Sequence, residues 1–269
     1  MHRSFKVGVF DSGIGGLNVL SACIRLAPHL NYYYIGDNKH APYGNKSCEE
    51  IYYRVSCAVE LFKLIGIDAV VLGCNTATAV CVQRLREKYA FPIIGTEPAV
   101  TPAARSYRRP LVICTPRTAE SARLKELIAR FPNVSFTVAP MPKLAGEIER
   151  SLTCGKLPTI ADHLPRGDYD CVILGCTHYA FVRSQIERFY RLPVFDGAEG
   201  TAKRLISLLD NKNIECKGRI LGTIDHRYLD CKNKQKFAFL KGICLNNVTF
   251  LGESRDINEK IYKQMFVLQ

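Results

Sequence analysis

Short apolar runs alternate along the chain with longer segments whose apolar residues recur at helical spacing. The short runs predict strands at residues 6–10, 32–35, 68–72, 92–94, 111–114, 134–138, 171–174 and 193–195. The longer segments predict helices at residues 16–26, 48–65, 77–89, 119–131 and 181–190. Strands and helices in alternation are typical of an α/β protein with largely parallel sheets.

One stretch of this pattern occurs twice. DAVVLGCNTATAV begins at Asp68 and DCVILGCTHYAFV begins at Asp170, and each places a cysteine directly after an apolar run and a glycine. Further along, YAFPII from Tyr89 matches YRLPVF from Tyr190 at nearly the same offset. A strand, a helix and a second strand are therefore shared, which predicts two pseudo-symmetric α/β lobes with the active site in the cleft between them.

The duplication also predicts how the chain is divided. We expect residues 1–97 together with 210–269 to form the first lobe and residues 98–209 to form the second. The tail predicts a strand at 219–223 and helices at 232–240 and 256–264, with no motif that points to chemistry.

Composition is that of a folded globular protein, with 47% hydrophobic and 23% charged residues. The first apolar run ends at Asp11, too early for a signal peptide, and no run reaches the roughly 18 residues that a membrane span needs. We therefore expect a cytoplasmic protein without a membrane partner. The 12 cysteines include no Cys-x-x-Cys pair and are expected to be reduced thiols, most of them structural.

The formal net charge is +12, which is compatible with a polyanionic partner. The basic residues are nevertheless spread along the chain in small clusters, such as Arg105, Arg108 and Arg109, with no accompanying aromatic motif. We expect a solvated basic surface and no nucleic-acid partner.

Polar residues follow four of the predicted strands, at the place where open parallel sheets bind their ligands. These segments are residues 11–13, 74–76, 115–118 and 176–178. A cysteine at the start of a helix lies near the positive end of the helix dipole, which favours its thiolate. Because Cys74 and Cys176 occupy the same place in the two copies, we predict that both thiols do chemistry.

The neighbours of the thiols allow more than one interpretation. Asp11 is either a helix N-cap or a base or ammonium ligand, and His178 either holds the proton of Cys176 or satisfies a backbone carbonyl. The Gly-rich loop at residues 13–16 lacks the Lys-Ser/Thr ending of a P-loop and favours approach to a small anion such as a carboxylate. A metal site from Cys74, Cys176, His178 and Asp11 lacks paired ligand spacing, and a cysteine hydrolase has no use for two matched thiols.

Five motifs follow one another between residues 7 and 200. They are VFDSGIGGL from Val9, Gly36-Asp37 with APYGNKS from Ala41, GCNTATA from Gly73, GTEPAVTPA from Gly95 and GCTH from Gly175. In this order they resemble the glutamate racemases of the cofactor-independent aspartate/glutamate racemase superfamily. The resemblance implies that one cysteine thiolate removes the α-proton of glutamate and the opposite thiol returns a proton to the other face, with no pyridoxal phosphate, other cofactor or metal.

The resemblance also assigns residues. The catalytic set is Cys74, Cys176, Asp11, His178 and Glu149, in which the two cysteines are the acid/base pair. The substrate-binding set is Asp11, Ser12, Tyr43, Gly44, Asn75, Thr76, Thr118, Thr177 and His178. Glu147 is an alternative to Glu149, because the segment after Thr137 matches the family only loosely.

The first hypothesis is an isomerase that interconverts L- and D-glutamate, with glutamate as its small-molecule partner. In bacteria such an enzyme supplies D-glutamate for peptidoglycan, and hence for cell-wall biogenesis and cell shape. A racemase of aspartate or another small amino acid is the alternative within the superfamily. An alternative of another class is a noncatalytic protein that binds a small acid or nucleic acid, against which the paired thiols argue. A homodimer is compatible with the sequence, which does not decide the oligomeric state.

Overall fold

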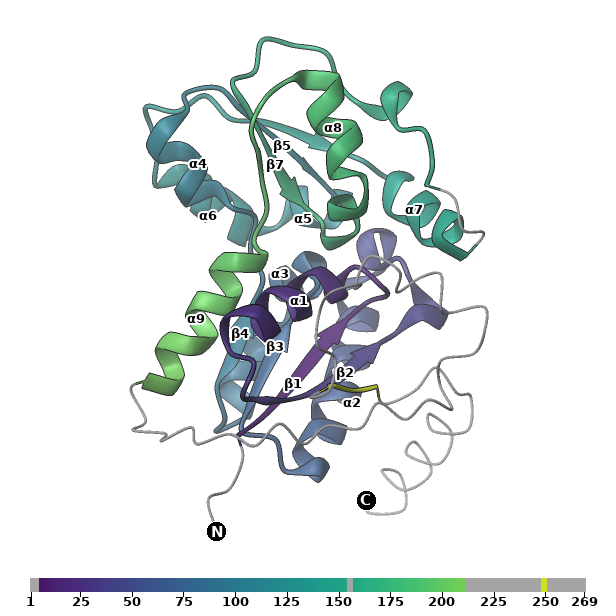
Figure 1. The fold of residues 1–269 in the computed structure, drawn as a ribbon, viewed down its shortest axis with the longest axis vertical. Coiled ribbons are helices and arrows are strands. Elements are labelled where there is room, and N and C mark those ends of the chain that lie inside the picture. Colours follow the sequence, from purple (N-terminus) through teal and green to yellow (C-terminus); the bar gives the residue numbers. More distant parts are fainter. Residues whose placement is uncertain (1–4, 154–156, 211–247, 251–269) are drawn as a thin grey trace.

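The computed structural model describes residues 5–153, 157–210 and 248–250. The described residues form two α/β lobes, which lie one above the other in Figure 1, each built around its own sheet. Among these residues, no helix has the length and apolar character needed to cross a membrane.

The first lobe contains a sheet of five described strands. They are β1 (Lys6–Asp11), β2 (Asn31–Gly36), β3 (Ala69–Leu72), β4 (Ile93–Gly95) and β9 (Val248–Phe250). Their order across the sheet is β4-β3-β1-β2-β9, and every neighbouring pair is parallel. The innermost strands β1 and β3 are buried on both faces, which explains why they form nearly continuous apolar runs.

The second lobe contains a sheet of four strands. They are β5 (Pro110–Cys114), β6 (Thr137–Pro140), β7 (Cys171–Gly175) and β8 (Val194–Phe195). Their order is β6-β5-β7-β8, again all parallel, so β5 to β8 repeat the spatial order of β1 to β4. The predicted fold class, two pseudo-symmetric α/β lobes with parallel sheets, is confirmed, and the repeat extends to four strands.

Nine helices are described. They are α1 (Gly16–Leu26), α2 (Cys48–Ile65), α3 (Asn75–Lys88), α4 (Val100–Ser106), α5 (Pro116–Glu120), α6 (Ala122–Ala129), α7 (Leu144–Thr153), α8 (Arg183–Tyr190) and α9 (Ala198–Asp210). Helices α1 and α2 have the predicted bounds. For α2 the local cause is clear: the Ser47 side chain accepts a hydrogen bond from the Glu50 N–H at the start, and Gly66 adopts φ 70° at the end.

Each sheet is covered by helices on both faces. In the first lobe, Val71 packs in the core with α1 and α9, while its neighbour Val70 packs on the other face with α2 and α3. In the second lobe, Leu174 lies in the core with α7 and α8, and Ile173 in the core with α4 and α6. This alternation is the two-residue period of a strand buried on both sides.

Four predicted elements differ from the structure by two residues or more, and α4, α7, α9 and β9 are absent from the prediction. The helix expected at 77–89 is α3, which begins at Asn75. The helix expected at 119–131 is divided into α5 and α6 at Ser121, whose hydroxyl accepts from the Leu124 N–H and donates to the Thr118 carbonyl. The strand expected at 134–138 is β6, which begins only at Thr137. The helix expected at 181–190 begins at Arg183, after a 3-10 segment over residues 177–182.

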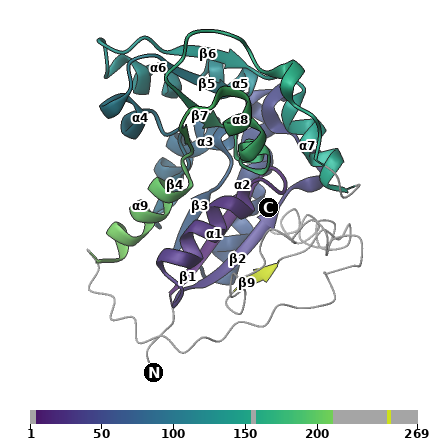
Figure 2. The same cartoon turned by 45° about the horizontal axis from the view of Figure 1, so that its top comes forward.

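Helix α9 packs on the first lobe. Ala202 and Leu205 lie in the same core as Leu20 of α1, and Figures 1 and 2 both draw α9 alongside β4. The predicted division counts α9 with the second lobe and stays a prediction. The elements expected at 219–223, 232–240 and 256–264 lie outside the described residues.

The aspartate that begins each copy of the repeat has the same structural role in both lobes. Oδ2 of Asp68 accepts from the Lys6 N–H at 2.9 Å, at the start of β1. Oδ2 of Asp170 accepts from the N–H groups of Arg108 and Arg109 at 2.6 and 2.8 Å, just before β5. Each carboxylate therefore links the start of the strand that leads to the site cysteine to the start of the neighbouring strand.

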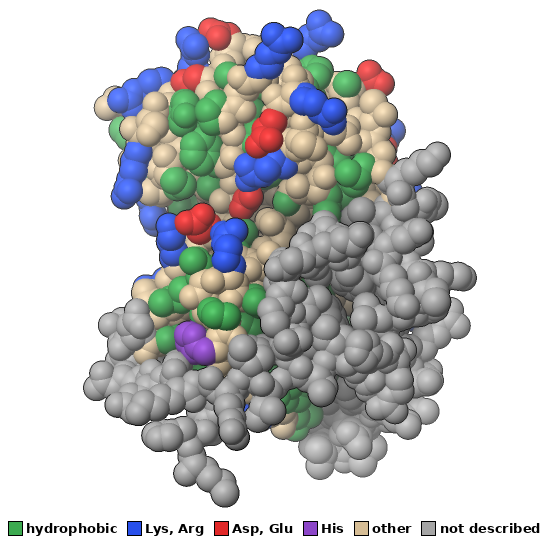
Figure 3. All heavy atoms as spheres, in the orientation of Figure 1, with side chains coloured by type: hydrophobic (Ala, Val, Ile, Leu, Met, Phe, Trp, Pro, Cys, Tyr) green, Lys and Arg blue, Asp and Glu red, His purple; other side chains and the backbone are tan. Residues whose placement is uncertain are grey.

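Charged side chains are dispersed over the face drawn in Figure 3. Lys and Arg side chains are scattered over the second lobe with Asp and Glu among them. Several form exposed pairs, such as Arg109 with Asp168 at 3.2 Å. Exposed pairs of this kind contribute little to stability, on the order of 0–1 kcal/mol each.

Candidate active site

The two lobes meet at the carboxyl ends of their strands. Strand β1 ends at Asp11, β3 is followed by Gly73 and Cys74, β5 is followed by Thr115, and β7 is followed by Cys176. These four side chains are buried, with Asp11 0%, Cys74 5%, Thr115 3% and Cys176 8% exposed. The segments that the sequence predicts to be functional therefore converge on one buried place between the lobes (Figure 1).

Cys74 lies at the N-cap of α3, so its sulfur faces the unpaired N–H groups of the first helical turn. Its Sγ accepts from the Ala77 N–H and from the Ser12 hydroxyl, each at 3.4 Å. Burial and the nearby Asp11 nevertheless raise the pKa of Cys74 to about 12, and these two donors offset only part of that rise. In this arrangement Cys74 is a protonated thiol at neutral pH.

Cys176 has a different neighbour. Nδ1 of His178 lies 3.8 Å from Sγ of Cys176, and Nε2 of the same ring lies 2.5 Å from Oε2 of Glu149 on α7. Burial by itself lowers the pKa of His178, but hydrogen bonds to Cys176 and Glu149 and the negative charge of Glu149 outweigh it, so the pKa lies well above its usual value. The imidazole beside Cys176 is therefore held as a cation.

Asp11 connects the two lobes. Its Oδ1 accepts from the Gly13 N–H at 2.8 Å, and its Oδ2 accepts from the Thr177 hydroxyl of the second lobe at 3.2 Å. Burial raises the pKa of Asp11 to about 6, against the opposing charge of His178 and the Gly13 hydrogen bond. Asp11 is not the N-cap of α1, because Gly15 takes that place and the carboxyl binds the Gly13 N–H before the helix begins. Its position among the catalytic candidates fits the other predicted role, that of a base or ammonium ligand.

The Gly-rich loop before α1 allows the lobes to approach closely. A Cβ on Gly15 would collide with the Thr177 hydroxyl and would lie 2.8 Å from the His178 nitrogen atoms N and Nδ1. A Cβ on Gly13 would lie 2.9 Å from Oε2 of Glu149. These glycines therefore leave room for side chains of the opposite lobe.

Three threonines form a hydrogen-bonded cluster across the lobe boundary. Oγ1 of Thr76 lies 2.9 Å from Oγ1 of Thr115 and 3.3 Å from Oγ1 of Thr118, and the last two are 3.0 Å apart. Asn75, the neighbour of Thr76, donates to the Thr96 carbonyl at 3.2 Å. The hydroxyl groups of both lobes are thus gathered at the start of α3, beside Cys74.

Tyr43 and Gly44 come from a short turn that joins β2 to α2. The Tyr43 hydroxyl donates to Oδ2 of Asp37 at 2.7 Å, and a Cβ on Gly44 would lie 2.8 Å from Cβ of Thr115. Both residues are buried, with Tyr43 1% exposed. The turn therefore contacts the second lobe at the residue that follows β5.

A family model described as Asp/Glu/hydantoin racemase matches residues 15–205 of the chain. The chain belongs to this racemase family. The match spans both thiols, the strands from β2 to β8 and three of the four polar segments that converge between the lobes, those at 74–76, 115–118 and 176–178. The protein is therefore an isomerase of the amino-acid racemase class.

Known racemases resemble the chain over most of its length. A glutamate racemase from Clostridium acetobutylicum is 37% identical over 79% of this chain and 87% of its own, and one from Campylobacter curvus is 36% identical over 84% and 91%. The crystal structure of a Bacillus anthracis glutamate racemase isoform superposes with a TM-score of 0.70 at 32% identity, covering 81% and 86% of the two chains. Escherichia coli glutamate racemase, in complex with L-glutamate and the activator UDP-MurNAc-Ala, gives a TM-score of 0.78 at 27% identity, covering 93% and 99%.

The structure of this racemase separates the two glutamates that the sequence left as alternatives. Glu149 points to His178, whereas Oε2 of Glu147 pairs with Nε2 of His163 at 2.8 Å. Among the described residues, no group of three or more His, Cys, Asp or Glu is arranged to hold a metal ion.

Two residues of the racemase site are missing from the sequence-based set. Thr115 joins the threonine cluster, and Asp37 holds the Tyr43 hydroxyl. Thr115 lies in the segment 115–118 that the sequence places at the binding edge, although the resemblance assigns only Thr118 of that segment to the substrate. The role of Asp37 depends on how the turn folds back and has no comparable sequence signal.

Proposed function

We propose that this racemase interconverts L- and D-glutamate by proton transfer between the substrate and two cysteines, without a cofactor. One observation carries the proposal: Cys74 and Cys176 follow equivalent strands of two facing lobes, and both are buried where Asp11 of the first lobe accepts a hydrogen bond from Thr177 of the second. Glutamate as the substrate is supported by the curated relatives named glutamate racemase and by the Escherichia coli enzyme, whose structure contains L-glutamate.

The two thiols have different neighbours, from which we assign their roles. The imidazole of His178, held by Glu149, lies beside Cys176, so Cys176 is assigned as the proton acceptor in one direction, whereas burial keeps Cys74 a thiol that can return a proton. In one direction of the reaction, the Cys176 thiolate takes the α-proton as the Cα–H bond breaks. The Cys74 S–H bond then breaks and its proton forms the new Cα–H bond on the opposite face. The reverse direction exchanges these roles.

The remaining site residues suit the binding of a small dicarboxylate. Backbone N–H groups at the start of α3, together with the hydroxyls of Ser12, Thr76, Thr118 and Thr177, are donors for carboxylate oxygens. The Asp11 carboxylate suits the substrate ammonium group. Fixed donors around a site closed to water also stabilise the carbanion that forms when the α-proton leaves.

The cellular role follows from the same chemistry. A glutamate racemase supplies D-glutamate for peptidoglycan, and thereby for cell-wall biogenesis and cell shape. We place the protein in the cytoplasm on the same grounds, with glutamate as its small-molecule partner. A homodimer stays a prediction. Neither a membrane nor a nucleic acid has a part in this function.

The test uses reduced protein in deuterated water without added cofactor. Incubated with L-glutamate, the protein should produce D-glutamate that carries deuterium at Cα, because the returning proton comes from a thiol that exchanges with solvent. A parallel incubation with L-aspartate should give far less product. The function is wrong if neither deuteration nor D-glutamate appears, and the substrate is wrong if aspartate is racemised faster.

A further inference from the structure

The turn that bears Tyr43 and Gly44 is fastened to the second lobe by three consecutive residues. Gly44 packs closely on Thr115, because a Cβ added to Gly44 would lie only 2.8 Å from the threonine Cβ. The Asn45 side-chain amide donates to the Pro142 carbonyl at 3.3 Å. The carbonyl of Lys46 accepts two hydrogen bonds from Arg117, at 3.2 Å from Nε and 3.0 Å from Nη2.

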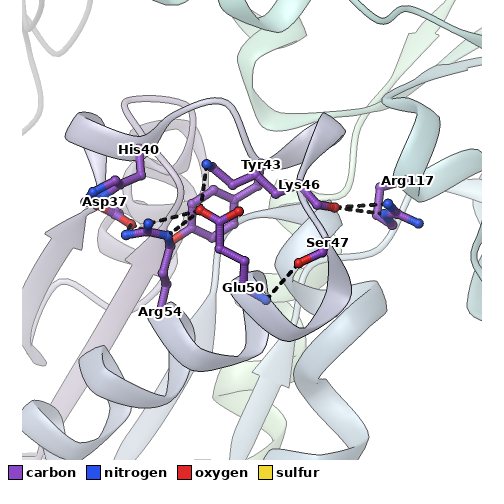
Figure 4. A network of polar contacts seen from close by, with 8 residues as sticks. All are labelled: Asp37, His40, Tyr43, Lys46, Ser47, Glu50, Arg54 and Arg117. Atoms are coloured by element: carbon purple, nitrogen blue, oxygen red, sulfur yellow. Dashed lines mark hydrogen bonds and ion pairs between the residues drawn. The ribbon is translucent and has the colours of Figure 1, made fainter.

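Arg117 makes the most constrained of these contacts. It lies in the first turn of α5, one residue before the site threonine Thr118, and Figure 4 shows it reaching across to the Lys46 backbone. Two N–H groups of one planar guanidinium on a single carbonyl fix the orientation of that carbonyl. Its third contact is an exposed ion pair between Nη1 and Oε2 of Glu120 at 3.2 Å.

The other end of the turn is held within the first lobe. The Tyr43 hydroxyl donates to Asp37, whose second oxygen lies 2.6 Å from Nδ1 of His40 and which also pairs with Arg54 at 3.8 Å (Figure 4). Lys46 itself is anchored through Nζ, 2.8 Å from Oε1 of Glu50. The tyrosine end of the turn is thus held by the first lobe. The other end, at the Lys46 carbonyl, is held by the hydrogen bonds from Arg117 of the second lobe.

We propose that Arg117 is a positioning residue for racemisation, which holds the turn of residues 43–45 in place through the Lys46 carbonyl when the lobes are closed. This inference rests on the proposed function, since the turn matters only where Tyr43 and Gly44 contact the substrate. Without the guanidinium, the turn loses its directional link to the second lobe, and Tyr43 and Gly44 are placed less accurately. Misplacement of about 1 Å at such a distance from the chemistry costs up to about 100-fold in rate.

The test compares Arg117→Ala and Arg117→Lys with Arg109→Ala. Arg109 is an exposed arginine of the same lobe whose side chain pairs with the exposed Asp168. We expect Arg117→Ala to lower kcat/KM about 10- to 100-fold in both directions, chiefly through a higher KM for glutamate. Arg117→Lys should recover only part of this loss, since an ammonium cannot present two fixed N–H groups. Arg109→Ala should behave as the wild type.

Chemical rescue distinguishes positioning from a general loss of structure. Arg117 borders a surface cavity of about 260 Å³, lined also by Arg84 and Glu120, so a small cation can reach the site of the deleted side chain. Guanidinium chloride at low millimolar concentration should restore part of the Arg117→Ala activity, and methylammonium chloride should not. The melting temperature of the variant should stay within about 4 °C of the wild type.

Each outcome decides between the two proposals. An inactive wild type disproves the proposed function. An active wild type with unchanged kinetics in Arg117→Ala disproves the positioning role alone. A loss of activity that guanidinium does not restore and that accompanies a large fall in melting temperature shows that Arg117 has only a structural role.

Discussion

Oε2 of Glu149 lies 2.5 Å from Nε2 of His178, and the other nitrogen of that ring faces the sulfur of Cys176. The same Oε2 accepts from the Ile14 N–H of the first lobe at 3.4 Å. One carboxylate thus orients the imidazole and touches the opposite lobe. The Cys74 sulfur instead accepts hydrogen bonds from the Ser12 hydroxyl and a backbone N–H. The duplicated thiols therefore have unlike surroundings.

Glu149→Gln should make the racemase lose activity at a lower pH than the wild type. The substitution removes the charge and the charge-assisted hydrogen bond that raise the pKa of His178, so burial again dominates and the pKa falls. The imidazolium beside Cys176 is then lost at a lower pH. We expect kcat/KM at pH 8 to fall about 10-fold, with its high-pH limb displaced toward acid, as measured in pH profiles.

Glu147→Gln is the matched control for this substitution. Glu147 belongs to the same helix, two residues earlier, but pairs with His163 and not with His178. Its pH profile should coincide with that of the wild type. Equal displacement of both profiles would show that the effect comes from α7 as a whole and not from the pair of Glu149 and His178.

Cys74→Ser and Cys176→Ser should each abolish racemisation, with a loss of at least about 100-fold. A serine hydroxyl preserves the shape of the side chain but gives up its proton far less readily than a thiol. The measurement is the rate of D-glutamate formation from L-glutamate and of the reverse reaction. Cys48→Ser, at an exposed cysteine outside the site, should keep full activity. Full activity in either site variant would remove that thiol from the mechanism.

The sequence predicted best the elements whose pattern follows directly from burial. β3 and β7 are buried on both faces, and their apolar runs stand out for that reason. The break at Ser121 could not be predicted in the same way, because apolar spacing continues across it. At this position the Ser121 hydroxyl accepts a hydrogen bond from the Leu124 N–H and starts a new helix, α6. Such a side-chain hydrogen bond to the backbone leaves no trace in the pattern of hydrophobic residues.

Parts of the site were predictable for a similar reason. Parallel strands bring their carboxyl ends to one edge, so the residues that follow β1, β3, β5 and β7 could be predicted to lie at the site. The choice between Glu147 and Glu149 was not predictable, because residues two apart on a helix point to different sides and the sequence does not show which side meets His178. The bond from Asp37 to Tyr43 depends likewise on tertiary packing.

Gly15→Ala should impair the approach of the two lobes. The added Cβ would collide with the Thr177 hydroxyl and press on His178, so either the loop or the second lobe must shift. We expect kcat/KM to fall at least about 10-fold and the free energy of unfolding to fall by about 1–3 kcal/mol. Gly200→Ala is the control: its Cβ would meet nothing within 4 Å on the exposed side of α9. That variant should gain up to about 1 kcal/mol, measured by urea unfolding. Unchanged kinetics in Gly15→Ala would mean that the lobes do not need this close approach.

Asp11→Asn should stabilise the folded protein more at pH 8 than at pH 4.5, while lowering activity. Burial raises the pKa of Asp11 from 3.8 to about 6, so the folded state binds its proton more tightly than the unfolded chain does. The wild type therefore loses stability as pH rises from about 4 through about 6, as the buried carboxyl must ionise, and the neutral asparagine avoids this loss. The difference in unfolding free energy between variant and wild type should grow by about 2 kcal/mol between the two pH values, measured by urea unfolding. A difference that stays constant with pH would show that Asp11 ionises as readily in the folded protein as in the unfolded chain.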